Sequence, residues 1–137
     1  MTLNAESTWT LFGKVPARGD FLLLGRRGED VTALESWLTT AVEQAHGALP
    51  AGAVRFVMRT PSAPNHVMGT WVPSQDTVGR TFPLVAFRAL PNDLNAAPWS
   101  ALFPLYDDLL DGLEVTLTAV REGEREPADA LLGLHEP

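Results

Sequence analysis

Three charged residues, Arg18, Asp20 and Arg80, are the main candidates in this sequence for a shared chemical site. Asp20 follows Gly19 and precedes an apolar run, and a carboxylate in such a loop commonly turns towards backbone N–H groups. Arg80 follows Gly79, and an arginine can hold a carboxylate through two parallel hydrogen bonds. We therefore predict that Asp20 pairs with Arg80 and ties together two loops that are distant in the sequence.

These residues belong to two sequence motifs of similar pattern. In each motif a glycine adjoins an arginine and a phenylalanine follows closely, which predicts two backbone corners that hold charges beside aromatic rings. We favour an architectural role for these corners over direct partner binding. The residues concerned are Gly13, Lys14, Pro16, Arg18, Gly19, Asp20 and Phe21 in the first motif, and Pro73, Asp76, Gly79, Arg80, Phe82 and Pro83 in the second.

Phosphate and metal sites are not predicted. The glycine and lysine of the first motif lack the Gly-x-x-x-x-Gly-Lys-Ser/Thr spacing that surrounds a phosphate with backbone amides. The three histidines are far apart in the sequence, and none forms a paired-ligand motif with a nearby carboxylate. The sequence thus predicts no metal and no cofactor.

A hydrolase would need a nucleophile beside a base. Ser74, Asp76 and His66 form the one nearby grouping of this kind, but no Gly-x-Ser-x-Gly elbow is present and Ser74 beside Pro73 is typical of a turn. We therefore predict no catalytic residue and a protein that is not an enzyme. The alternative is a small-ligand-binding or hydrolase domain that uses a cluster of the three charged residues named first.

The motifs must be positioned by strands, which are predicted from runs of β-branched and aromatic residues bounded by turn residues. The second and third runs are separated by a short turn-forming segment, which suits an antiparallel pair. Residues 21–24 are compatible with a further strand or with an apolar turn. The predicted strands lie near residues 9–14, 53–59, 66–72 and 82–90.

Two long amphipathic helices are predicted from apolar residues that recur at the helical period. The first begins after Asp30 as its N-terminal cap and ends near Gly47. The second begins at Trp99 and keeps its apolar face in phase as far as Val120. Residues 113–121 also alternate in the manner of a strand, but we favour a helix because the phase of the apolar face is kept.

Two features of these helices suggest contacts with another protein. Trp37 lies at the edge of the apolar face of the first helix, where an exposed indole can anchor a partner. Asp107, Asp108, Asp111 and Glu114 form an acidic patch along the second helix. We interpret this patch as a solvated face that could also meet an arginine-rich partner surface.

Together these elements predict an α/β fold, a three-layer sandwich with a largely antiparallel central sheet flanked by two long helices. The length of 137 residues suits a single domain spanning residues 1–137. Residues 1–8 and 122–137 are expected to be flexible or peripheral.

Composition excludes several classes of function. The net charge of −7 argues against a nucleic-acid surface, which needs a clustered excess of lysine and arginine. No apolar run approaches the ~20 residues of a membrane span, so no membrane insertion is expected. The N-terminus does not read as a secretory signal and no cysteine is present. We therefore expect a cytoplasmic protein.

The two motifs and the spacing between them resemble those of the TagF (ImpM) family, accessory proteins of bacterial type VI secretion systems. The resemblance extends over residues 9 to 90. It implies a cytoplasmic post-translational regulator that represses assembly of the secretion apparatus by binding a forkhead-associated scaffold protein. It also implies the same α/β sandwich.

Overall fold

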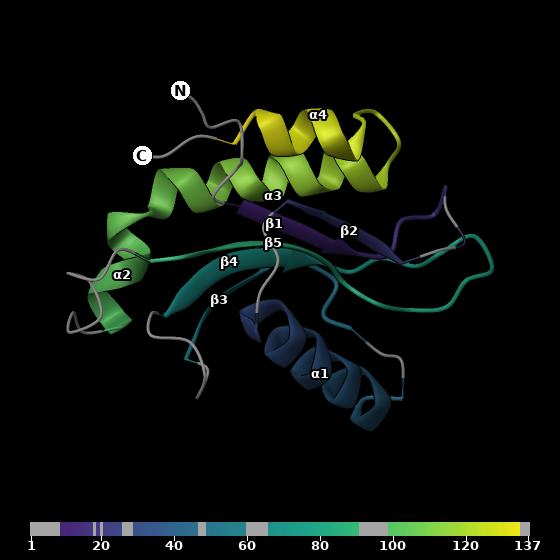
Figure 1. The fold of residues 1–137 in the computed structure, drawn as a ribbon, viewed down its shortest axis with the longest axis horizontal. Helices are drawn as coiled ribbons and strands as arrows, with labels where there is room; N and C mark the ends of the chain where they lie inside the picture. Colours follow the sequence, from purple (N-terminus) through teal and green to yellow (C-terminus); the bar gives the residue numbers. More distant parts are fainter. Residues whose placement is uncertain are drawn as a thin grey trace.

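A sheet of antiparallel strands lies at the centre of the fold (Figure 1). The computed structural model describes residues 9–17, 19, 21–25, 29–46, 49–59, 66–90 and 99–134. Within these residues the sheet has five strands in the order β2-β1-β5-β4-β3, and each neighbouring pair is antiparallel. The strands are β1 (Trp9–Gly13), β2 (Leu22–Gly25), β3 (Val54–Met58), β4 (Val67–Val72) and β5 (Leu84–Ala89).

Helices lie on both sides of this sheet (Figure 1). The N-terminal helix α1 lies on one side, and α3 lies on the other with α4 beside it. The helix α2 lies near one end of the sheet. The helices are α1 (Glu29–Gln44), α2 (Trp99–Leu105), α3 (Asp107–Arg121) and α4 (Pro127–Leu132). None of these described helices is both long and apolar enough to cross a membrane.

The central strand β5 shows how the sheet supports two cores. Successive side chains of a strand point to opposite faces. Leu84 and Ala86 are therefore buried in the cluster that contains the apolar face of α3, whereas Val85 and Phe87 are buried with the apolar face of α1. Because both faces are covered, β5 is apolar almost throughout and does not show the alternation of a half-exposed strand.

The predicted strands are confirmed, and the antiparallel pairing of the second and third runs is confirmed with them. Residues 21–24, left open between strand and turn, contribute to β2, which pairs with β1 from Thr10↔Gly25 to Gly13↔Leu22. The sheet is therefore antiparallel throughout the described strands. Its edge strand next to β1 is β2, which the sequence left undecided.

The second predicted helix differs from the structure because it is divided. Tyr106, with φ −111° and ψ 19°, separates α2 from α3, and the two helices run in different directions (Figure 1). Pro104 lies inside α2 and has no backbone N–H to donate to the preceding turn, which weakens the helix just before the break. Residues 113–121 all lie in α3, so the choice of helix over strand is confirmed.

The first predicted helix is confirmed as α1, although it begins at Glu29 rather than after a cap at Asp30. Its predicted inward residues Val31, Leu34 and Leu38 are buried against the sheet. Burial of this face, rather than intrinsic propensity alone, is what stabilises a helix of this length.

Candidate functional site

The two sequence motifs meet at one corner of the fold, where β1 and β4 end and β5 begins (Figure 1). We call the described residues 13–21 and 73–83 the motif corner. Gly13 and Val72 lie on either side of Leu84, the first residue of β5. The hydroxyl of Thr77 donates a hydrogen bond of 3.2 Å to the carbonyl of Pro16, which joins the two loops directly.

The second motif forms a tight hairpin loop. Gly79 donates its backbone N–H to the carbonyl of Asp76 at 3.0 Å, and Asp76 donates its own to the carbonyl of Arg80 at 3.1 Å. Gly79 has φ +86°, a left-handed conformation that glycine adopts readily. Gln75 and Thr81 form an antiparallel bridge below the turn. The loop between β4 and β5 is thus held in one conformation by its own backbone.

The carboxylate of Asp76 is the centre of the motif corner. One oxygen, Oδ1, accepts hydrogen bonds from the backbone N–H groups of Val78 (3.0 Å) and Arg80 (2.9 Å). The other, Oδ2, accepts a bond of 2.6 Å from Nε of Arg80 and lies 3.5 Å from Nζ of Lys14. The residue is 1% exposed. Asp76 therefore closes its own loop and ties it to the first motif through Lys14.

These contacts set the charge state of Asp76. Burial by itself would raise the pKa of this carboxyl group, because it disfavours the ionised form. The backbone N–H of Arg80, its guanidinium group and the N–H of Val78 act in the opposite direction and prevail, so the pKa falls from 3.8 to about 2. Asp76 is ionised at neutral pH and serves as an acceptor, not as a proton donor.

This depressed pKa predicts how stability depends on pH. The native state binds protons at Asp76 less readily than the unfolded chain, so the stabilisation is complete above the unfolded pKa near 4 and is lost as pH falls towards 2. Melting temperatures measured from pH 7 to pH 2 should show Asp76→Asn far below the wild type at pH 7, with the gap closing below about pH 4. A gap that stayed constant to pH 2 would contradict this role.

The predicted pairing of Arg80 with Asp20 involves a residue that the structure does not describe. Asp20, and Arg18 beside it, lie outside the described residues, so their pairing stays a prediction. Arg80 does reach the first motif, because its Nη2 donates a hydrogen bond of 3.2 Å to the carbonyl of Gly19. Its strongest described partner is Asp76, within its own motif. A link between the two loops is therefore present, through motif residues that the sequence analysis named but did not pair with one another.

Sequence reasoning singled out Asp76 but missed its part in this network. A signal was available, because aspartate at the first position of a β-turn and glycine at the fourth, here Asp76 and Gly79, favour a type I turn closed by the aspartate side chain. Such a turn keeps the carboxylate for its own backbone. Read in this way, the motif predicts Asp76 as an internal acceptor.

Aromatic rings from both motifs pack against one another at the motif corner. Phe21 and Phe82 meet edge to face with ring centroids 5.2 Å apart. Phe12 of β1 lies 6.0 Å from Phe21 and 6.4 Å from Phe82. One aromatic residue from each motif therefore packs against Phe12. Such ring pairs stabilise the fold beyond the burial of their apolar area.

A cavity of about 370 Å³ opens beside the motif corner. It lies between the two loops and the end of α3, where Nη1 of Arg121 donates a hydrogen bond of 2.9 Å to the carbonyl of Pro73. Neither Asp76 nor Arg80 is among its lining residues, so the described charges of the corner do not converge on it. Among the described residues, those that line the cavity are Pro16, Leu49, Pro73, Ser74, Gln75, Thr81, Arg121 and Glu122.

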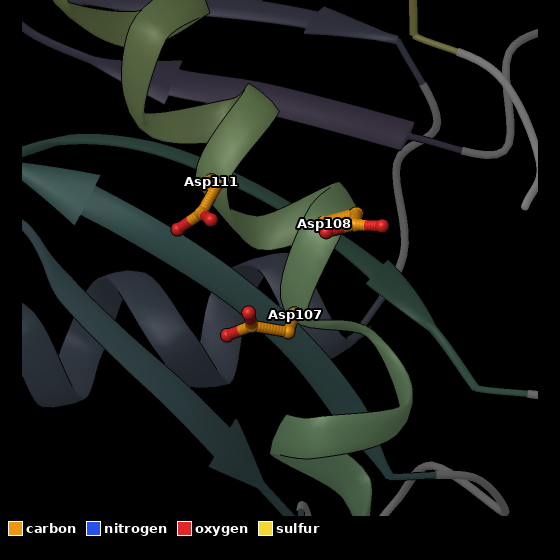
Figure 2. Close-up of side chains that lie close together, drawn as sticks. All are labelled: Asp107, Asp108 and Asp111. Carbon is orange, nitrogen blue, oxygen red and sulfur yellow. The ribbon is translucent and has the colours of Figure 1, made fainter.

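The predicted acidic patch gathers at the start of α3 (Figure 2). The carboxylates of Asp107, Asp108 and Asp111 come within 4.8 Å of one another. Arg55 of β3 reaches two of them, with Nη1 2.6 Å from Asp107 and Nη2 hydrogen-bonded to Asp111. The hydrogen bond with Asp107 is the main cause that raises the pKa of Arg55. The arginine that meets this patch therefore comes from the same chain and ties β3 to α3.

Trp37 is exposed, as its place on the predicted helix indicated. It is 51% exposed, and its ring lies 5.9 Å from that of Trp71 in the sheet. Trp71 in turn lies 5.4 Å from Phe56. The indole of Trp37 is thus the outer end of an aromatic row that begins in the core, and its role as a partner contact stays a prediction.

Known proteins resemble this chain in both sequence and fold. A family model described as the TagF N-terminal domain, type VI secretion system-associated, matches residues 10–133. The crystal structure of PA0076 from Pseudomonas aeruginosa PAO1 is similar, with a TM-score of 0.76 and 28% sequence identity. The similarity covers 94% of this chain and 63% of that one, so this chain spans less than two thirds of the solved relative. No curated protein matches this chain.

Proposed function

This chain belongs to the family of type VI secretion-associated TagF N-terminal domains, and from that premise we propose that it is a non-enzymatic regulator of such a secretion system. It acts in the cytoplasm, after translation, by binding another protein. The partner we propose is the forkhead-associated scaffold protein of the apparatus. Binding represses assembly of the apparatus.

The observation that carries this proposal is the family match over residues 10–133, which includes both motifs. The geometry of the motif corner supports it. Asp76 and Arg80 bond to each other and to the backbone, which suits a structural support for a binding surface better than a pair of groups that exchange protons with a substrate.

The alternative, a ligand-binding or hydrolase domain built on Arg18, Asp20 and Arg80, has less support. It needs these side chains to line a cavity, whereas Arg80 is absent from the lining of the cavity beside the corner. In the grouping of Ser74, Asp76 and His66, the depressed pKa of Asp76 argues against a general acid or base, because efficient catalysis needs a pKa near the working pH.

Affinity capture from the native host tests the proposal. The tagged intact chain should recover the scaffold protein, and deletion of its gene should increase type VI secretion. Trp37→Ala should recover at least tenfold less scaffold, because an exposed tryptophan that anchors a partner is a typical hot spot worth about 2 kcal/mol. Leu105→Ala serves as the control, since Leu105 is a large exposed apolar residue on a different helix.

Two results together would overturn the proposal. The first is capture by the intact chain of no component of the apparatus, and the second is unchanged secretion in the deletion strain. A melting temperature for Trp37→Ala is needed beside these data, because Trp37 also packs on Trp71.

A further inference from the structure

The motif corner carries an exposed surface of mixed character. Val78 is 72% exposed at the tip of the hairpin loop, and Phe21 is 38% exposed on the neighbouring loop. The side chain of Arg80 is 64% exposed, and it donates a hydrogen bond to the carbonyl of Gly19, two residues before Phe21 in the sequence. We call Phe21, Val78 and Arg80 the Arg80 surface.

The described charged residues at this surface are mainly positive, whereas the whole chain is negative. Lys14 and Arg80 share one carboxylate, that of Asp76, whose side chain is fully buried. Among the described residues of the corner, two cations thus face one anion, and Arg80 is the more exposed of the two cations. The chain as a whole carries a net charge of −7. An acidic group that approaches the protein is therefore disfavoured by the net charge of the chain and favoured at the exposed Arg80.

The charged group of this surface is also held in place. The guanidinium of Arg80 is oriented by Asp76 on one side and by the carbonyl of Gly19 on another. The backbone that carries Val78 and Arg80 is fixed by the same carboxylate. A group that is already ordered loses less conformational entropy on binding, which favours affinity.

We propose that the Arg80 surface binds an acidic segment of a partner protein, with a carboxylate against Arg80 and an apolar side chain against Val78 and Phe21. The planar guanidinium group of arginine can hold a carboxylate through two parallel hydrogen bonds. The apolar pair beside it distinguishes a protein segment from a free anion. This inference rests on the proposed function only in taking the partner to be a protein.

A peptide titration tests the surface by itself. The isotope-labelled full chain is titrated with an acidic peptide of glutamate and leucine, and with its lysine and leucine counterpart. The acidic peptide should shift the amide signals of residues 19–21 and 76–80, and the basic peptide should not. Shifts produced equally by inorganic phosphate would overturn the proposal, because they would show a site for free anions.

Matched variants make the test specific. Val78→Glu should weaken binding of the acidic peptide roughly tenfold, because the new carboxylate occupies Arg80 and repels the peptide. Val115→Glu is the control, since Val115 is 71% exposed on α3 and receives the same charge. Val115→Glu should weaken binding of the acidic peptide by less than about twofold, because salt screens a charge that lies far from the binding surface. Equal losses in the two variants would overturn the proposal.

The purified scaffold protein, titrated with the same variants, separates this inference from the proposed function. If the scaffold binds and Val78→Glu weakens it, both are supported. If the scaffold does not bind the wild type, the proposed partner is wrong, while the peptide data still decide the Arg80 surface. If the scaffold and the peptide both bind and Val78→Glu changes neither, the Arg80 surface is wrong and the proposed function stands.

Discussion

Replacement of Gly13 with alanine should lower the free energy of unfolding by roughly 3–5 kcal/mol. Gly13 has φ +130°, a conformation essentially restricted to glycine. A Cβ atom there would overlap the carbonyl oxygen of Pro83 and crowd the Cα of Leu84, and both are backbone atoms that cannot rotate away. Gly13 pairs with β2 on one side and β5 on the other, so the sheet has little room to yield.

Two other glycines provide internal controls for this measurement. Gly79 also has a positive φ, +86°, but nothing lies within 4 Å of an added Cβ, so Gly79→Ala should cost only about 1 kcal/mol of backbone strain. Gly112 lies in α3 with open space around it, and Gly112→Ala should stabilise the helix by about 0.5–1 kcal/mol. Urea denaturation followed by circular dichroism measures all three. If Gly13→Ala were no worse than Gly79→Ala, the close approach of β1 and β5 would be wrong.

The fold could be predicted where local sequence decides the structure. The apolar face of α3, from Leu110 to Val120, keeps the helical period over its whole length, so burial on one side of a helix was readable from spacing alone. The break at Tyr106 was not readable in the same way. A proline such as Pro104 indicates that a helix is disturbed nearby, but where the chain changes direction depends on how α2 and α3 pack in the fold, and no short pattern encodes that.

The candidate site could be predicted in its location but not in its pairing. The motifs identified two loops that hold charges beside aromatic rings, and the loops do meet. Several carboxylates were available to Arg80, and sequence spacing cannot rank them, because the choice depends on backbone geometry. Arg55 illustrates the same limit, since its partners Asp107 and Asp111 lie on a helix far along the chain and follow from the packing of α3 on the sheet.

Replacement of Asp76 with alanine should lower the melting temperature by roughly 10 °C. The change leaves the N–H groups of Val78 and Arg80 without their acceptor, and it leaves Lys14 and Arg80 without their shared anion. Asp76→Asn should fall between the wild type and alanine, because its amide oxygen can still accept from the two N–H groups but its charge is gone. Calorimetry of the three proteins at pH 7 gives this order.

The size of the Asp76 effect separates a structural support from an ordinary surface charge. Asp108→Ala makes the same chemical change at an exposed aspartate of α3 and should shift the melting temperature by no more than about 3 °C. The double variant of Asp76→Ala with Arg80→Ala should be less destabilised than the sum of the single variants, because each removes the same bond. Strict additivity, or equal shifts for Asp76→Ala and Asp108→Ala, would mean that the carboxylate does not hold the motif corner together. The Arg80 surface would then lack the fixed backbone on which its affinity depends.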